Sequence, residues 1–192
     1  MQEQIKENKR RGLAGTLCSA FLNIMELYIY EDYRVMFPES SGRHLTDILI
    51  KDALRAYGIK DCKIMRTDKG KPYVEKSESS FQTHISVSHS GSYFVCLISS
   101  DPVGVDVQEE RHVNARKIGC RYFTCREREI IDRRGNDGFF FIWARKEAYS
   151  KYTGLGMEEI FKGTPVIDRE DVEFVDFQLE KGVYCSCCRR KR

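Results

Sequence analysis

The order of the predicted helices and strands indicates an α+β protein made of two α/β subdomains with largely antiparallel sheets. A strand, a helix and several short strands succeed one another in residues 25–107, and helices followed by a strand pair occur again in residues 108–192. A chain of 192 residues can form two small halves that share a core. We therefore expect these two ranges to be the subdomains and residues 1–24 to be an N-terminal extension that packs poorly.

The first subdomain is predicted to start with a strand at residues 26–30 and to continue with a helix at residues 43–57. Apolar side chains in the second segment repeat with helical periodicity, and Gly58 follows as a helix end. Residues 62–65 then favour a strand that enters a basic, glycine-containing turn at residues 68–72.

Three further strands are predicted at residues 85–88, 93–99 and 103–107. Short turns containing serine, glycine, aspartate and proline separate them, so we expect consecutive strands to pair as an antiparallel meander. The third strand carries Asp106 where a buried strand would ordinarily continue with Val or Ile. This carboxylate is therefore a candidate for chemistry.

Two helices are predicted to open the second subdomain. Thr124 precedes Glu127 by three residues, which is a capping-box pattern and places a helix at residues 124–133. Residues 139–152 show the strongest helical pattern in the chain, and Gly154 follows as its end.

The second subdomain is predicted to finish with a hairpin of residues 172–179 and 183–187. Its second strand carries Cys185, Cys187 and Cys188, three of the eight cysteines in the chain. These three could bind a soft metal, but neither a paired Cys-x-x-Cys pattern nor clustered histidines accompany them. We therefore expect reduced thiols throughout, because the chain is longer than a disulfide-stapled secreted domain.

The composition gives no global signal for nucleic acid or a membrane surface as partner. The 32 basic and 29 acidic side chains leave a formal charge of only +3. The apolar stretch at residues 13–30 superficially imitates a signal peptide, but Asn23 and Glu26 interrupt it and no clear cleavage site follows. No stretch is long and apolar enough to span a bilayer. We expect a cytoplasmic protein.

An acid and a base lie one helical turn apart on the strongest predicted helix. Trp143, Glu147 and Lys151 follow i, i+4, i+8 spacing and so share one helix face. A Glu–Lys pair of this kind is commonly a solvated surface pair worth about 0.3–0.5 kcal/mol. Together with Asp106, however, it could form a divalent metal site with a nearby lysine, which is the usual equipment for handling phosphates.

Four motifs occur in the order and spacing of a known enzyme family. They are Gly70-Lys71-Pro72, Ser88-His89-Ser90-Gly91, Gly104-Val105-Asp106-Val107 and Trp143-Ala144-Arg145-Lys146-Glu147-Ala148-x-x-Lys151. On these motifs the chain resembles the Sfp-type 4′-phosphopantetheinyl transferases over approximately residues 25–188, and their joint occurrence is far more specific than any one of them.

The resemblance implies two similar α/β subdomains in a pseudo-twofold relation, with the active site at their interface. Such enzymes move 4′-phosphopantetheine from coenzyme A onto a serine of an apo acyl or peptidyl carrier protein and release 3′,5′-adenosine bisphosphate. Asp106 and Glu147 match the family's Mg²⁺ ligands. Mg²⁺ would need few protein oxygens, because substrate oxygens and water complete its shell.

Gln108 departs from the family pattern, which often has an acid at this position. Period-two alternation places its side chain on the strand face of Asp106. An amide oxygen can ligate Mg²⁺ but brings no charge, so a third contact from Gln108 would be weak, water-mediated or absent.

The resemblance also assigns the contacts with coenzyme A. Ser88 and His89 would touch its phosphates, Lys71 and Pro72 belong to the upstream motif, and Arg43 would flank its nucleotide with Lys71. Taken singly, such residues are more ordinary: a histidine at a strand end is often satisfied by a loop, and basic side chains are often solvated.

Lys151 and Glu147 carry the chemistry in this interpretation, together with Asp106. Lys151 would lie at the diphosphate and neutralise charge on the leaving phosphate. Glu147 is the candidate general base for the carrier serine, either directly or through water. Trp143 is expected to be structural, with its indole filling space beneath the helix.

The expected carrier protein is acidic around its serine, and the second subdomain offers a basic run that could dock it. Its members are Arg116, Lys117, Arg121, Arg126 and Arg128, with Glu127 and Glu129 as acidic neighbours that would make the run a solvated helix face instead. A monomer is the simplest expectation for the oligomeric state.

Two rival functions stay open at this point. A Mg²⁺-dependent nuclease could use an acid on a strand with Glu147 and Lys151 on a helix, although the chain lacks the basic, aromatic surface that it would need. A degenerate carrier-binding module without catalysis is made plausible by Gln108. Which carrier is modified is not visible in the sequence.

Overall fold

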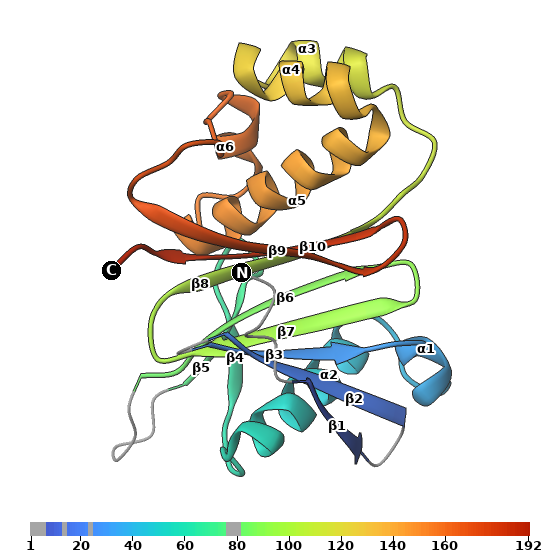
Figure 1. Cartoon of the computed structure of the whole chain (residues 1–192). Helices are drawn as coiled ribbons and strands as arrows, with labels where there is room; N and C mark the ends of the chain where they lie inside the picture. Colours follow the sequence, from blue (N-terminus) through green and yellow to red (C-terminus); the bar gives the residue numbers. More distant parts are fainter. Residues whose placement is uncertain (1–6, 13–14, 23–24, 76–81) are drawn as a thin grey trace. The chain divides into compact units, whose positions relative to one another are not determined.

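The structure is a computed structural model that describes residues 7–12, 15–22, 25–75 and 82–192. The chain divides into two compact units, Met1–Pro102 and Val103–Arg192. Helices and antiparallel sheets occur in both units, which confirms the predicted α+β class (Figure 1).

The first unit contains seven described strands and two helices. In chain order they are β1 (Glu7–Gly12), β2 (Gly15–Leu22), β3 (Met25–Tyr30), α1 (Tyr33–Met36), α2 (Gly42–Tyr57), β4 (Ile64–Arg66), β5 (Pro72–Val74), β6 (His84–Ser90) and β7 (Tyr93–Ser99). The second unit contains three described strands and four helices. They are β8 (Val103–Glu109), α3 (Ala115–Tyr122), α4 (Cys125–Arg134), α5 (Asn136–Thr153), α6 (Met157–Phe161), β9 (Val172–Glu180) and β10 (Val183–Arg190).

The core of the first unit lies between a five-stranded sheet and α2. The sheet has the order β1-β2-β3-β7-β6, and each neighbouring pair is antiparallel. Every residue of β7 is buried, because this strand lies inside the sheet. The apolar stripe of α2 contains Leu45, Leu49 and Leu54 and packs into the same core, and the helix ends at Gly58 with a left-handed φ of 107°.

Residues 7–12 and 15–22, which belong to the range predicted as an extension, are paired as strands. β2 pairs with β3 along the run Leu17–Leu22, and β1 pairs with β2. The sequence prediction started the first subdomain at residue 25, because residues 25–30 resemble the first strand of the family, which begins almost at the start of its chains. The structure places two further strands, β1 and β2, before this one in the same sheet.

The second unit is a three-stranded antiparallel sheet covered by α5. The sheet order is β8-β10-β9, so the last strand of the unit lies in the centre. The predicted meander is therefore wrong in one respect: β6 pairs with β7, but β8 pairs with β10, from Val183↔Glu109 to Arg189↔Val103. Because β8 pairs with β10, it belongs to the second unit, which begins at Val103. The boundary expected from the sequence lay between residues 107 and 108.

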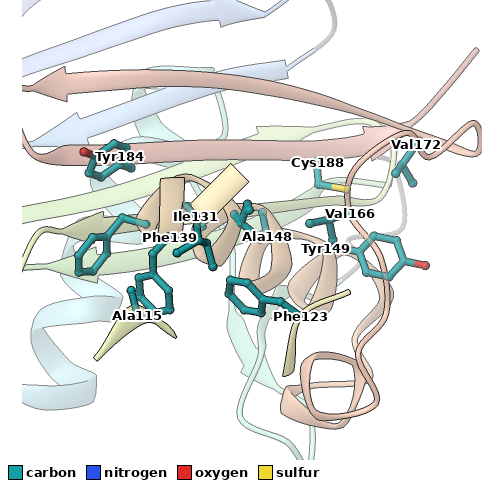
Figure 2. Close-up of a cluster of buried hydrophobic side chains, with 13 residues drawn as sticks. Ala115, Phe123, Ile131, Phe139, Ala148, Tyr149, Val166, Val172, Tyr184 and Cys188 are labelled. Carbon is teal, nitrogen blue, oxygen red and sulfur yellow. The ribbon is translucent and has the colours of Figure 1, made fainter. Parts of the chain in front are cut away.

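Aromatic side chains from α5 fill the core of the second unit. Phe139 stacks on Phe123 at a ring-centroid distance of 5.7 Å (Figure 2). Phe140 stacks on Tyr184 of β10 at 6.0 Å. Small side chains such as Ala148 let the helix lie close to the sheet. This packing fixes the position of α5, and hence of its polar side chains, on β8 and β10.

None of the helices in the described part of the chain has both the length and the apolar character needed to cross a bilayer.

Candidate active site

The backbone of α5 rests directly on β8 at Gly104. A Cβ atom at this position would overlap the carbonyl oxygen of Ala148 and lie 2.5 Å from the amide nitrogen of Tyr152. The backbone dihedrals of Gly104 are not the reason for the glycine, because its φ lies outside the left-handed region. The glycine is needed so that a helix and a strand can touch backbone to backbone.

This close approach places the stripe of α5 over Asp106. Trp143, Glu147 and Lys151 occupy successive turns of one face, as their spacing predicts. Lys151 Nζ donates a hydrogen bond to Asp106 Oδ1 at 2.7 Å. Because α5 ends at Gly154, with φ of 73°, Lys151 lies in its last turn, where a cation is favourable.

Asp106 is a buried carboxylate that is held from two sides. Its residue exposure is 1%, against 28% for the Lys151 side chain that pairs with it. Gln108, two residues further along β8, donates from Nε2 to Asp106 Oδ2 at 2.7 Å. The amide therefore lies on the same strand face as Asp106, as alternation predicts, and it stabilises this carboxylate without adding negative charge.

Glu147 is half-buried next to a second carboxylate. Burial raises the pKa of Glu147 to about 7, and the negative charge of Asp106 and a hydrogen bond with it act in the same direction. Lys151 and the hydrogen bond from Trp143 oppose these effects. A carboxyl group with a pKa raised in this way can accept a proton near neutral pH, and a second carboxylate beside it favours a bound cation.

Trp143 has both a packing role and a polar one. Its ring stacks on Phe139 at 5.7 Å and lies 6.1 Å from Phe123, so it belongs to the edge of the core, as predicted. Its Nε1 also donates to Glu147 Oε1 at 2.7 Å. The packing role was predicted from the sequence and the hydrogen bond was not, although the i, i+4 spacing of Trp143 and Glu147 is the signal that indicates it.

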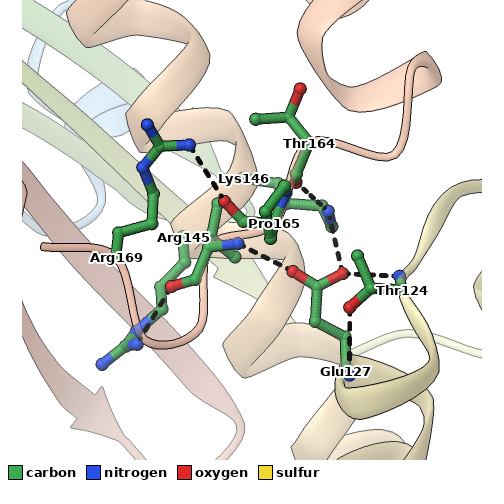
Figure 3. Close-up of polar contacts among 8 residues, drawn as sticks. Thr124, Glu127, Arg145, Lys146, Thr164, Pro165 and Arg169 are labelled. Atoms are coloured by element: carbon green, nitrogen blue, oxygen red, sulfur yellow. Dashed lines mark hydrogen bonds and ion pairs between the residues drawn. The ribbon is translucent and has the colours of Figure 1, made fainter. Parts of the chain in front are cut away.

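A buried ion pair anchors α5 to α4 directly beside the site. Lys146 Nζ lies 3.0 Å from Glu127 Oε2, and the two side chains are 1% and 0% exposed (Figure 3). Lys146 also donates to the carbonyl oxygen of Thr164 at 2.6 Å. Burial lowers the pKa of Lys146, and the charge of Glu127 counteracts this effect.

Glu127 is satisfied from the backbone as well as by the lysine. Its Oε1 accepts from the amide of Val166 at 2.9 Å, and its Oε2 accepts from the amide of Thr124 at 2.9 Å. The second bond completes the predicted capping box of α4. The idea that Glu127 is a solvated neighbour of the basic run is therefore wrong. The sequence did contain a signal for this buried pair. Lys146 follows Ile142 by four residues and so lies on an apolar face of the helix, where a lysine needs a buried acidic partner.

Two predicted coenzyme A contacts lie at the end of β6 in the first unit. Ser88 is buried, whereas His89 is exposed and its ring lies 6.2 Å from that of Tyr33. Ser88 pairs in register with Val95 of β7. The strand end thus presents a histidine to solvent beside an anchored serine.

The predicted basic turn borders a cavity of about 510 Å³ in the first unit. Thr67 and Lys71 close the turn with a backbone hydrogen bond of 3.0 Å, and Gly70 adopts the left-handed φ of 82° that the turn requires. Lys71 and Pro72 line this cavity, and Arg43 is exposed in the first turn of α2. The cavity is large enough for part of a nucleotide.

The candidate metal ligands Asp106, Glu147 and Gln108 lie close together in the second unit, but they include only two carboxylates. Within residues 7–12, 15–22, 25–75 and 82–192, no group of three or more His, Cys, Asp or Glu side chains is placed to hold a metal ion. Two carboxylates, Asp106 and Glu147, and the Gln108 amide are the donor set that the structure brings together.

Comparison with known proteins agrees with the motifs. Residues 102–189 match the model of the 4′-phosphopantetheinyl transferase superfamily. The chain is 29% identical over 142 residues to the 4′-phosphopantetheinyl transferase gsp of Aneurinibacillus migulanus, which covers 64% of this chain and 56% of that protein. It is 26% identical over 120 residues to the 4′-phosphopantetheinyl transferase Sfp of Bacillus subtilis (strain 168), covering 59% and 52%.

A third relative matches a larger share of the chain. The 4′-phosphopantetheinyl transferase HetI of Nostoc sp. (strain PCC 7120 / SAG 25.82 / UTEX 2576) is 25% identical over 163 residues, which covers 80% of this chain and 66% of that protein. The chain spans about half the length of the first two relatives, 56% and 52%. The resemblance to Sfp-type 4′-phosphopantetheinyl transferases predicted from the motifs is confirmed.

Proposed function

We propose that this protein transfers 4′-phosphopantetheine from coenzyme A to a serine of an apo acyl or peptidyl carrier protein, with release of 3′,5′-adenosine bisphosphate. One observation carries the proposal: Asp106, Glu147 and Lys151 form one contact set within the segment that matches the superfamily model. A buried carboxylate pair with an adjacent lysine suits a reaction in which charge moves between phosphate oxygens.

Mg²⁺ is the metal that these residues fit. Asp106 and Glu147 are close enough to raise the pKa of Glu147 by mutual repulsion, and a divalent cation would relieve this repulsion. Mg²⁺ is typically held by one or two carboxylates together with substrate phosphates and water. Asp106 and Glu147 would hold it, with Gln108 as a neutral third contact. Bound there, Mg²⁺ supplies positive charge to the diphosphate.

Different residues would contact different parts of coenzyme A. Lys151, which pairs with Asp106 in the free protein, would turn its ammonium group to the diphosphate. The resemblance assigns the remaining contacts to Arg43, Lys71, Pro72, Ser88 and His89. The exposure of His89 and the cavity beside Lys71 support these assignments, because both groups can be reached by a ligand.

Glu147 would take the proton of the carrier serine. The serine oxygen forms a bond to the β-phosphorus of coenzyme A, and the bond from that phosphorus to the bridging oxygen breaks. The serine proton goes to Glu147 directly or through one water. The pKa of about 7 belongs to the metal-free carboxyl, and Mg²⁺ bound to it would reduce its basicity, so a bridging water or the carboxylate oxygen that does not hold the metal would receive the proton. The negative charge left on the departing phosphate falls near Lys151.

A single mass measurement tests the proposal. An apo carrier protein incubated with this protein, coenzyme A and Mg²⁺ should gain the mass of one phosphopantetheine group on its serine. Glu147→Gln should abolish this gain, and the exposed Glu129→Gln should not. Binding of the carrier without any mass gain would favour a non-catalytic binding module and would contradict the proposal.

The proposal includes a cytoplasmic monomer, which the sequence also predicts. Light scattering after size-exclusion chromatography should give the mass of one chain of 22.4 kDa. A stable dimer at micromolar concentration would contradict the monomer.

A further inference from the structure

The turn between α3 and α4 brings two exposed cysteines to one guanidinium group. Cys120 lies near the end of α3, and Cys125 is the first residue of α4. Arg128 donates from Nη2 to Cys125 Sγ at 3.0 Å. Cys120 lines the same cavity as Cys125 and Arg128, and the two sulfurs beside the guanidinium raise the pKa of Arg128.

This pair differs in its access to solvent from the five other cysteines whose side chains the structure describes. Cys96 and the three cysteines of β10 are buried, and Cys62 is half-buried. Cys120, Cys125 and Arg128 line a surface cavity of about 330 Å³. Arg116 and Asp132 also line this cavity, and the distance between Arg116 Nε and Asp132 Oδ1 is 3.6 Å. A small reagent can therefore reach both thiols, and a cation beside an exposed thiol is the setting in which proteins keep reactive cysteines.

We propose that Cys120 and Cys125 are a dithiol modification site that closes to an intramolecular disulfide by exchange with small disulfides. The sulfur of Cys125 attacks one sulfur of the small disulfide and displaces one small thiol. The sulfur of Cys120 then attacks the mixed disulfide at Cys125 and displaces the second small thiol. The two protein thiols are oxidised, and one small disulfide is reduced to two thiols.

The order of attack follows from the contacts. Cys125 holds the hydrogen bond of 3.0 Å from Arg128 and is the first residue of a helix, where backbone amides favour negative charge. Cys120 is near the end of α3, where the carbonyl groups favour positive charge. Cys125 is therefore the attacking thiol, and Cys120 is the resolving one.

The disulfide would enclose a residue of the core. Only four residues separate the two cysteines, and one of them is Phe123, which stacks on Phe139 and lies 6.1 Å from Trp143. Trp143 is the single tryptophan of the chain. A restraint on Phe123 changes the surroundings of this indole, so tryptophan emission reports closure of the disulfide without any measurement of transfer activity.

Mass spectrometry of the full chain with oxidised glutathione tests the site. The wild type should lose two hydrogens without retaining glutathione, and peptide mapping should find Cys120 joined to Cys125. Cys120→Ser should retain one glutathione on Cys125, and Cys125→Ser should react more slowly. The tryptophan emission of the wild type should shift on oxidation and return with a reducing agent, and that of Cys120→Ser should shift less.

Other outcomes overturn particular parts of the proposal. Stable glutathione on both cysteines of the wild type, or a disulfide that involves neither residue, would overturn the dithiol site. Faster reaction of Cys125→Ser than of Cys120→Ser would overturn the order of attack. Unchanged emission in a protein shown by mapping to hold the disulfide would overturn the link to Trp143. None of these results depends on the transferase proposal, because neither coenzyme A nor a carrier is present.

Discussion

Gly104 and Ala148 meet backbone to backbone, so the carbonyl oxygen of Ala148 occupies the place where a Cβ of residue 104 would be. Asp106 follows Gly104 by two residues on β8, and Glu147 immediately precedes Ala148 on α5. The separation of the two main-chain segments that carry these carboxyl groups is thus set by a backbone contact, which no rotation of a side chain can relax.

Gly104→Ala is expected to push α5 away from β8. Overpacking of this kind costs about 1–3 kcal/mol of stability. A displacement of reactive groups by about 1 Å costs on the order of 10²-fold in transfer rate. Urea unfolding and the carrier mass assay measure the two effects. The double variant Gly104→Ala/Ala148→Gly should not recover, because the obstructing atom belongs to the backbone, and recovery would refute this explanation.

Glu147→Gln is expected to stabilise the metal-free protein at high pH while it abolishes transfer. The folded protein raises the pKa of Glu147 from its ordinary 4.5 to about 7, so this group favours folding below pH 4.5 and loses that contribution as the pH rises through about 7. The variant should exceed the wild type by about 2 kcal/mol at pH 8 and equal it at low pH.

Thermal unfolding at several pH values in the presence of a chelator measures this difference. Glu129→Gln, at an exposed position of α4, is the control and should show no pH-dependent gain. Equal stability of Glu147→Gln and wild type at pH 8 would mean that the carboxyl is not strained by burial and by Asp106.

Lys146→Met is expected to destabilise the protein strongly. It leaves the carboxylate of Glu127 buried without its counter-charge, which costs about 3–5 kcal/mol. The double variant Lys146→Met/Glu127→Gln should be more stable than Lys146→Met, because the neutral amide still accepts from the Val166 amide. Chemical denaturation measures the free energy of unfolding of the wild type and of both variants, and the exposed Lys162→Met is the control. Equal stability of the single and the double variant would contradict a buried charge as the cause.

Gln108→Glu is expected to make the protein depend more on Mg²⁺. The new carboxylate replaces a hydrogen-bond donor to Asp106 Oδ2 with a repelling charge, and a third acid strengthens a Mg²⁺ site. Thermal shift assays should show lower stability without Mg²⁺ and a larger gain with Mg²⁺ than in the wild type. Gln178→Glu on β9 should show no such gain, and an equal gain in both variants would rule out a specific site at Gln108.

Charge removal at Lys117 and Arg121 is expected to weaken carrier docking. Both side chains belong to the basic run on α3, and both are exposed. Lys117→Gln/Arg121→Gln should raise the Michaelis constant for an acidic carrier by about 3–10-fold and leave that for coenzyme A unchanged, because long-range steering acts on the protein partner. Lys181→Gln in the β9–β10 turn is the control. Equal effects on both substrates would contradict docking at α3.

The sequence predicted most elements of the fold, because periodicity and capping are local properties. The helix α5, its end at Gly154 and the capping box of Thr124 and Glu127 all follow from short patterns. The short helix α3 was missed, since its charged residues show little apolar periodicity. The pairing of β8 with β10 was also missed, because partner choice depends on segments about 80 residues apart, from 103–109 to 183–190.

Part of the site was also predicted, because spacing along a helix or a strand is a local property of the sequence. Helical spacing put Trp143, Glu147 and Lys151 on one face, and strand alternation put Gln108 beside Asp106. The elevated pKa of Glu147 could not be predicted, because it arises from burial and from an Asp on another element. The buried pair of Lys146 and Glu127 likewise depends on the packing of α4 against α5.

The central position of β10 has a consequence for the order in which the site is built. In the described part of the chain, β8 finds its strand partner in β10, which is the last strand to be synthesised. During synthesis from the N-terminus, Asp106 leaves the ribosome well before the strand that holds β8 in place. The second unit therefore completes its sheet only after β10 has been synthesised, and Asp106 waits for its strand partner while more than 70 further residues are made.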